Sequence, residues 1–511
     1  MEAAMASRLS MTFRNAFWSY ISMIATLVLR FVSRTVFIRF LGANYLGING
    51  LFTNILGVLS FAELGIGTAM NFSLYKPVAQ QDVQKIKSYM YCYKWAYRFV
   101  AGIVGGLGLL LLPFLDALVK DPGNVGNIRV YYLIYLFDTV ISYFVAYKFS
   151  IAYAEQKGYL FTNINTLVSS ATVVAQIAAL YLWQNYVVYL LISSIVNLLK
   201  NIFVSRYLNC LYPYLKDRDA VPLPKEELMV LVRKIKALIV HKIGEISVHQ
   251  TDNIIISAFI NVGTVGLISN YNLLMTTISG FINVLFNSVT GSLGNLVATE
   301  SKAKQYEIFR IYRFIGFWFY GFTAIALFIL STPFITLWLG ADMVVSDVVI
   351  GLILLNYYMM GHRICLNNIK TVGGLVEQDK YVALIQSAVN LVSSVALVRV
   401  IGLPGVYLGT ILQGMISTIV KPLIVYKTMF GISPRYYFID AIKYLAALIL
   451  GLIPCLLARQ VLLQEVNLFG FILTMAVTAL VPNGLFLLLF FRRAEFRYVL
   501  EMGRRLLSRK I

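Results

Sequence analysis

Residues 99–115 read FVAGIVGGLGLLLLPFL, a stretch without a single charged side chain. Because an α-helix rises about 1.5 Å per residue, about 20 apolar residues cross the roughly 30 Å hydrocarbon core of a bilayer. Similar stretches recur along the whole chain. A transmembrane strand would need only about 10 residues with alternating apolar and polar side chains, and these stretches do not alternate. The sequence therefore predicts an all-α integral membrane protein.

The composition of the chain agrees with this prediction. Of its 511 residues, 59% are hydrophobic and only 13% are charged, with a mean hydropathy of +0.76. Soluble domains carry about 25% charged residues. We predict about 14 transmembrane helices, at residues 15–40, 45–70, 89–115, 130–152, 160–184, 186–207, 239–260, 265–297, 311–332, 346–366, 381–401, 405–427, 439–459 and 468–490.

The positive charges indicate how the chain is oriented. A net charge of +20 would be typical of a nucleic-acid-binding protein if the chain were soluble. With both termini inside, however, 35 of the 43 Lys and Arg residues fall in inner segments, 5 fall outside and 3 lie within spans. This bias follows the positive-inside rule. We therefore expect an inner-membrane protein with cytoplasmic termini and no nucleic-acid partner.

The spans divide into two groups of six and a final pair. We predict an N-terminal lobe over 1–207, a cytoplasmic loop over 208–238, a C-terminal lobe over 239–430, a helix pair over 431–491 and a basic cytoplasmic tail over 492–511. Two groups that begin on the same side suit a parallel repeat. The second part of the loop, Glu226 to Lys236, is either a basic amphipathic helix on anionic headgroups or a solvated loop.

Three arginines inside spans are candidate substrate-binding residues. An ionisable side chain within the bilayer is costly, so it normally faces a cavity or a protein partner. Arg30 and Arg34 are four residues apart and share one helical face, where two guanidinium groups suit a pyrophosphate. The alternative is that each arginine pairs with a carboxylate on a neighbouring helix. Arg98 either faces the same cavity or extends to the inner headgroups, like Lys94 one turn earlier.

The seventh span carries a polar stripe that we interpret as a candidate ion-coupling region. Lys242, Glu245, His249 and Asp252 follow one another at helical spacing on a span otherwise rich in Ile and Val. Glu245 and Asp252 would bind a coupling cation or titrate, and His249 would carry a proton near neutral pH. Structural hydrogen bonding is the alternative. The stripe lacks the companions of a metal site, so no metal is predicted.

Other polar residues within spans have less specific surroundings. Glu63 and Asp138 are candidate ion-coupling or cavity residues, and Arg363 is a candidate substrate-binding residue; the alternative for each is an interhelical ion pair. The run Ser269 to Asn272, which includes the candidate sugar ligand Asn270, either lines the outer mouth or caps a helix that opens there.

No residue pattern points to an enzyme. The chain has no Gly-Lys-Ser/Thr phosphate loop, and the predicted outer loops are too short for a catalytic domain. We therefore predict a transporter without catalytic residues. A membrane glycosyltransferase or ligase is a disfavoured alternative.

Several motifs resemble the bacterial polysaccharide repeat-unit flippases. They are RTVFIRFLGANYLG at 34–47, FAELGIGTA at 61–69, TDNIIIS at 251–257, SNY at 269–271, GNLVATES at 294–301 and PFITLWLG at 333–340. The chain is similar, over nearly its whole length, to the Wzx-type O-antigen and capsule flippases. These belong to the multidrug/oligosaccharidyl-lipid/polysaccharide exporter (MOP) superfamily.

This resemblance implies a fold, a substrate and partners. The fold is two six-helix lobes in a V, as in MATE transporters, plus two extra C-terminal helices. The substrate is an undecaprenyl-pyrophosphate-linked oligosaccharide, flipped across the bacterial cytoplasmic membrane by alternating access with no cofactor beyond a coupling proton or sodium ion. The family motifs place an arginine at Arg34 and acids at Glu63 and Asp252.

The implied partners are the lipid-linked oligosaccharide, membrane lipids, and a polysaccharide polymerase with its chain-length machinery. A multidrug or organic-cation extruder of the same superfamily is the main alternative. Such an extruder would favour acids and aromatic side chains in its cavity over arginines.

Overall fold

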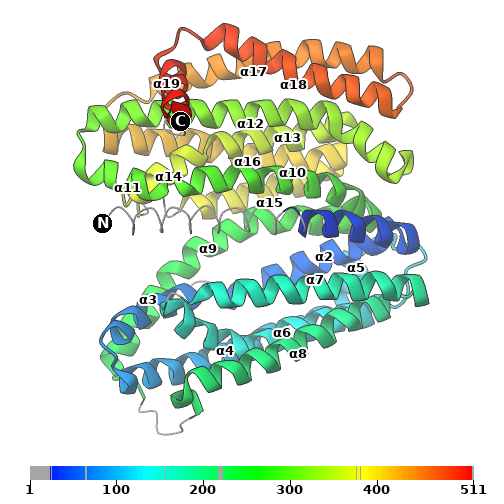
Figure 1. Ribbon diagram of the computed structural model, residues 1–511. Coiled ribbons are helices and arrows are strands. Elements are labelled where there is room, and N and C mark those ends of the chain that lie inside the picture. Colours follow the sequence, from blue (N-terminus) through cyan, green and yellow to red (C-terminus); the bar gives the residue numbers. More distant parts are fainter. Residues whose placement is uncertain are drawn as a thin grey trace. The chain divides into compact units, whose positions relative to one another are not determined.

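The computed structural model describes residues 24, 26–63, 66–155, 157–216, 222–375, 377–379 and 381–508, and no strand occurs among them (Figure 1). The chain forms two compact units, residues 1–242 and residues 243–511. In the first unit, residues 26–41 are helical and precede α2 (Ala43–Leu59), η1 (Ser60–Glu63), α3 (Ile66–Ala79), α4 (Val83–Leu111), η2 (Leu112–Phe114), α5 (Leu115–Leu118), α6 (Ile128–Ala154), α7 (Gly158–Trp183), α8 (Tyr186–Leu211) and η3 (Pro213–Lys216).

The boundary between the units falls inside α9 (Lys225–Phe259). The second unit continues with α10 (Val262–Ser288), α11 (Thr290–Thr299), α12 (Lys302–Leu339), η4 (Ala341–Met343), α13 (Asp347–His362), α14 (Ile364–Val372), η5 (Glu377–Asp379), α15 (Val382–Ile401), α16 (Leu403–Val425), the π-helical turn η6 (Tyr426–Phe430), α17 (Arg435–Leu462), α18 (Leu468–Phe490) and α19 (Ala494–Ser508).

The helices expose large apolar side chains, as expected of surfaces that face lipid. On α4, Phe99 is 70% exposed and Leu110 is 69% exposed, whereas Val104 is fully buried against the other helices. Monomeric soluble proteins rarely expose such continuous apolar surfaces. Eleven helices among the described residues are long and apolar enough to cross a membrane. The all-helical membrane architecture is thus confirmed.

The count of 14 spans stays a prediction. The three predicted spans outside those eleven helices correspond to residues 26–41, to α2 with η1 and α3, and to the second half of α9. The first residues of the predicted span 1 lie outside the described residues. The predicted span 2 is interrupted, because the chain turns through the 3₁₀ segment η1 at Ser60–Glu63.

Helix α9 begins well before the predicted start of span 7. Its first residue is Lys225, so the second part of the predicted loop is helical and continuous with the span. Glu227 accepts hydrogen bonds from Lys85 Nζ (2.8 Å) and Tyr89 Oη (3.2 Å) of α4. The hydrogen bond from Lys85 holds the pKa of Glu227 below its ordinary value. The first turn of α9 is therefore fastened to α4.

Helix α10 also begins earlier than predicted. Asn261 caps it by accepting a hydrogen bond from the Thr264 backbone N–H (2.7 Å). The prediction that Ser269–Asn272 opens or caps this helix is therefore wrong, because these residues lie two turns inside it. Asn270 is fully buried in the second unit.

Helices α15 and α16 pack more closely than ordinary helix pairs. Gly402, with a φ of +65°, turns the chain between them. A Cβ added at Gly405 or Gly409 would overlap backbone atoms of Leu397 or Ser394. Small residues four apart let transmembrane helices approach in this way. This close contact brings polar side chains of both helices together, as described below.

A buried ion pair joins α14 to η5, in the segment that leads to α15. Lys370 Nζ donates to Asp379 Oδ2, and the two side chains are 8% and 5% exposed. Replacing Asp379 with alanine leaves the ammonium group buried without its counter-charge, which costs about 3–5 kcal/mol. We expect a clear loss of thermal stability in detergent or nanodiscs. The matched control is Asp342→Ala at an exposed position, and equal stability of the two variants would contradict a stabilising role for the pair.

Candidate functional site

Arg34 is half-buried in the first unit, on the helix formed by residues 26–41. Tyr189 of α8 lies beside its guanidinium group and is hydrogen-bonded to the neighbouring Ser33. The ring of Phe37, one turn further, packs edge-on against Tyr189 at 5.1 Å between centroids. Tyr189 therefore contacts consecutive positions on one face of this helix. These contacts orient the part of the helix that carries Arg34.

Arg30 and Arg98 have more open surroundings than Arg34. Arg30 lies one turn before Arg34 and is exposed within the unit. Arg98 of α4 is also exposed, and its guanidinium group lies over the Trp95 ring, 5.1 Å from the centroid. An arginine stacked on an aromatic face keeps its N–H donors free for other acceptors. This geometry is compatible with both interpretations of Arg98.

Glu63 lies at the interruption between α2 and α3 and faces tyrosines. Tyr97 Oη of α4 donates to Glu63 Oε1 at 3.4 Å, and Tyr143 Oη of α6 donates to Ser60 Oγ at 2.8 Å. The two rings lie 6.2 Å apart. The Tyr97 hydroxyl thus donates a hydrogen bond to the Glu63 carboxylate.

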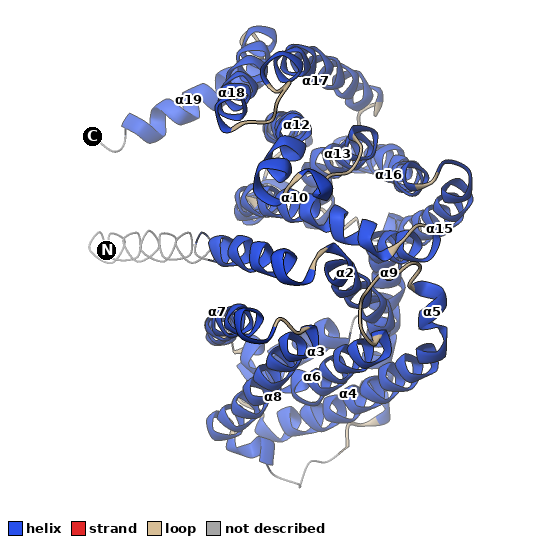
Figure 2. Ribbon diagram, turned by 90° about the vertical axis from the view of Figure 1, so that its right-hand side faces the viewer, coloured by secondary structure: helices blue, strands red, loops and turns tan. Residues whose placement is uncertain are grey.

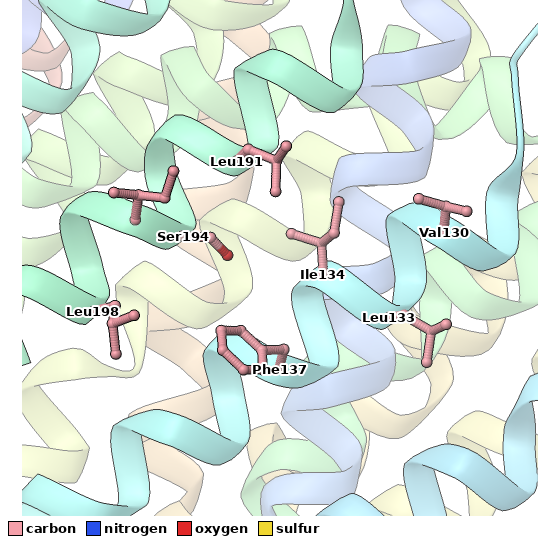
Figure 3. A pocket seen from close by; sticks show the side chains of 8 residues that line it. Val130, Leu133, Ile134, Phe137, Leu191, Ser194 and Leu198 are labelled. Atoms are coloured by element: carbon pink, nitrogen blue, oxygen red, sulfur yellow. The ribbon is translucent and has the colours of Figure 1, made fainter.

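Asp138 lies in α6 and is held by α8. Ser194 Oγ donates to Asp138 Oδ1 at 2.5 Å. Beside this bond, a groove of about 310 Å³ runs between the two helices, and Ser194 is its one polar lining residue among Val130, Leu133, Ile134, Phe137, Leu191, Ile195 and Leu198 (Figure 3). An apolar groove of this kind accommodates hydrocarbon and offers nothing to a sugar or an ion. Asp138 therefore belongs to the helix interface.

Asp252 of α9 lies in a polar network within the second unit. Thr410 Oγ1 of α16 donates to Asp252 Oδ2 (2.9 Å), and Asn390 Nδ2 of α15 donates to Thr410 Oγ1 (3.2 Å). Thr251 Oγ1 donates to Asn390 Oδ1 at 2.9 Å. Asp252 Oδ1 is buried and has no hydrogen-bond partner among the described residues. Three helices thus meet in one hydrogen-bonded network, in which the Thr410 hydroxyl contacts the carboxylate.

The donor set around Asp252 is chemically suited to a small hard cation. The network comprises a carboxylate, an amide oxygen, hydroxyl oxygens and the Val406 carbonyl, which accepts from Ser394. Oxygen atoms of these types coordinate sodium in membrane transporters. Among the described residues no group of three or more His, Cys, Asp or Glu could hold a metal ion. A single carboxylate balances the charge of one monovalent cation or one proton.

Sequence reasoning missed Asn390 and Thr410, although a signal was present. Buried polar residues recur at helical spacing on both helices: Gln386, Asn390 and Ser394 on α15, and Thr410, Gln413 and Ser417 on α16. Gln386 Nε2 donates to Gln413 Oε1 (2.7 Å), and Ser417 Oγ donates to Gln386 Oε1 (2.7 Å). A polar stripe on an apolar helix must face protein or water. The two stripes face each other and lead to Asp252.

The remaining candidates divide into two kinds. The side chains of Glu245 and His249 lie outside the described residues, so both stay predictions. Arg363 lies at the junction of α13 and α14 and is 7% exposed. It donates from Nη1 to the Gly414 carbonyl (2.8 Å) and from Nε to the Met359 carbonyl (3.0 Å). Its donors hold the helices of the second unit together.

Lys148 of α6 is a buried cation that sequence reasoning also missed. It is 7% exposed, and its Nζ donates to Ser205 Oγ (2.7 Å) and Asn209 Oδ1 (2.9 Å) of α8. Its position near the predicted inner end of a span resembles that of a lysine reaching for headgroups. The contacts with neutral acceptors instead join α6 to α8.

Comparisons with known proteins identify the fold. No family model and no curated protein matches the chain. Among solved structures, the inward closed conformation of the lipid II flippase MurJ has a TM-score of 0.60 at 16% identity, covering 92% of this chain and 98% of that one. An inward-facing multidrug resistance MATE transporter of the MOP superfamily has a TM-score of 0.55 at 13% identity, covering 77% and 92%.

The MATE multidrug transporter DinF-BH has a TM-score of 0.54 at 17% identity, covering 81% of this chain and 95% of that one. The chain therefore has the MATE/MurJ-like fold. Together with the apolar helices, this fold makes it a multi-pass membrane protein.

Proposed function

We propose that this protein is a flippase that moves an undecaprenyl-pyrophosphate-linked oligosaccharide from the inner to the outer leaflet of the bacterial cytoplasmic membrane. The observation that carries the proposal is Arg34, a half-buried guanidinium group on the helix formed by residues 26–41. A guanidinium group binds phosphate oxygens through two parallel hydrogen bonds. Arg30, one turn away and exposed, supplies a second cation for a pyrophosphate.

The fold supports a lipid-linked substrate. The lipid II flippase matches 92% of this chain, whereas the MATE multidrug transporters match 77% and 81%. In our proposal the pyrophosphate and sugars enter a cavity lined by Arg34 and Arg30, and the polyprenyl tail stays in the lipid. Alternating access then exposes the polar part to the opposite side. The product would serve polymer synthesis for capsule, O-antigen or exopolysaccharide.

Net transport in one direction needs a source of free energy, because binding alone shifts no equilibrium between the leaflets. We propose that a sodium ion or proton held by Asp252, Asn390, Thr410 and the Val406 carbonyl couples the lobes to the membrane gradient. Asp252 Oδ1, buried without a hydrogen-bond partner among the described residues, is the atom that such a cation would satisfy.

The second candidate function is the export of organic cations. The MATE fold and the acidic side chains at Glu63 and Asp252 favour it. The two candidates differ in the charge of the cargo, because Arg30 and Arg34 would repel an organic cation.

The test is transport by the purified protein in proteoliposomes. We expect a fluorescent polyprenyl-pyrophosphate oligosaccharide to change leaflets in a protein-dependent manner, at a rate that depends on an imposed sodium or proton gradient. The same vesicles loaded with a fluorescent organic cation are expected to show no efflux. Cation efflux without lipid transfer would replace the flippase proposal with the extruder.

A further inference from the structure

Helix α19 is fastened to the second unit by its first turn. Glu495 forms an ion pair with Arg310 of α12, and its side chain is only 4% exposed. Phe496 stacks on Trp318 of α12 with 5.8 Å between ring centroids. Only residues 491–493 separate α19 from α18, a helix long and apolar enough to span the membrane. Helix α19 thus starts where α18 ends and is held there.

The helix runs across the direction of the spans of its own unit. Figure 1 shows α12, α17 and α18 lengthwise and α19 foreshortened, whereas Figure 2, turned by 90°, shows α19 lengthwise as it extends away from α18. A helix that follows a membrane span and turns across it lies along the membrane surface. The first turn packs on α12, and the described residues beyond it are largely exposed.

The described side chains of α19 separate into two faces. At 100° per residue, Phe496, Val499, Leu500 and Met502 fall on one side of the helix, and Arg497, Glu501 and Arg504 fall on the other. Leu500 is 46% exposed and Met502 is 44% exposed, so the apolar face continues beyond the part that α12 covers. Arg497 and Arg504 lie on the other face, which is exposed and mainly cationic.

We propose that α19 is an interfacial helix that binds anionic phospholipid headgroups. Its uncovered apolar side chains enter the boundary of the acyl chains, and Arg497 and Arg504 bind the phosphates around it. The positive charges of the two arginines favour anionic headgroups as the binding partner of α19, because a neutral bilayer offers no net charge to attract them. The proposal requires only that α18 crosses the membrane, so it is independent of the transported substrate.

The test uses the full-length protein in phosphatidylcholine vesicles with and without phosphatidylglycerol. Cys92 and Cys210 are replaced by serine, whereas Cys365 and Cys455 are fully buried and do not react. A bimane label is attached at Met502→Cys on the apolar face or at Glu501→Cys on the opposite face. Quenching by a lipid with a nitroxide high on its acyl chain then reports contact with the bilayer.

In vesicles with phosphatidylglycerol we expect strong quenching of the label at 502 and weak quenching at 501. Arg497→Gln with Arg504→Gln is expected to lower the partitioning of the helix about fivefold for each arginine removed. Raising the ionic strength to about 1 M, where the Debye length is about 3 Å, is expected to have a similar effect. The charge-matched control is Arg39→Gln with Arg399→Gln, at two exposed arginines outside α19.

Equal quenching at 501 and 502 would overturn the proposal, because the helix would then have no face in the lipid. Equal quenching at 502 in neutral and anionic vesicles, or no change in the double arginine variant, would also overturn it. If the double arginine variant shows altered quenching but still flips lipid, the binding of α19 to headgroups is independent of the proposed transport function.

Discussion

Arg34→Ala is expected to abolish measurable transfer of the pyrophosphate-linked oligosaccharide while leaving expression and membrane insertion intact. Removing one partner of a desolvated, hydrogen-bonded charge pair costs about 2–5 kcal/mol. Even the lower figure corresponds to about a 30-fold loss of affinity for the pyrophosphate group. The measurements are polymer production in cells and leaflet transfer of the labelled lipid in proteoliposomes.

Arg39 supplies the matched control, since it lies on the same helix and is exposed. Arg39→Ala is expected to transfer lipid at the wild-type rate. Arg34→Lys keeps the charge and loses the planar fork, so we expect an intermediate rate. Normal polymer production by Arg34→Ala would remove Arg34 from the proposed site.

Asp252→Asn is expected to remove the response of the protein to its coupling cation. Asparagine has nearly the same size and still accepts the hydrogen bond from Thr410, so the network should keep its shape. The amide lacks the negative charge that a cation requires. A cation present at 100 times its dissociation constant stabilises the folded protein by about 2.7 kcal/mol, and this stabilisation should disappear in the variant.

The experiment compares thermal unfolding in sodium and in choline salts at several pH values, followed by gradient-driven transport. Thr410→Val removes one hydroxyl oxygen and is expected to weaken the sodium effect without eliminating it. Asp342→Asn, at an exposed position in η4, is the control and should behave as the wild type. Sodium stabilisation of Asp252→Asn equal to that of the wild type would rule out a sodium site at Asp252. A response to pH alone would identify the proton as the coupling ion.

Hydropathy predicted the membrane helices well because each span has to bury about 20 residues in hydrocarbon. Hydropathy failed to predict the start of α9, where charged residues interrupt the apolar pattern but the helix continues. Lys225 to Lys236 contains four basic and two acidic residues, yet it forms the start of α9 because Glu227 is bonded to α4. That contact joins segments far apart in the sequence, so no local pattern contains it.

The candidate site was predicted in part for a related reason. A charge inside a span is conspicuous, so Arg34, Glu63 and Asp252 stood out in the sequence. Asn390 and Thr410 are neutral, and each alone resembles an ordinary packing residue. Their relation to Asp252 depends on the contact between α15 and α16, which Gly405 and Gly409 permit. Lys148 was missed because its acceptors, Ser205 and Asn209, lie on another helix.

The partners of Asp252 all come from the second unit, whereas Arg34 and Tyr189 belong to the first. If recognition of cargo rests on Arg34 and use of the ion gradient rests on Asp252, natural selection can alter one of these two functions without the other. Substitutions within the first 242 residues could then adapt the protein to another glycolipid while its energy source stays the same. Chimaeras that exchange the first unit between such transporters are accordingly a route to new cargo specificity.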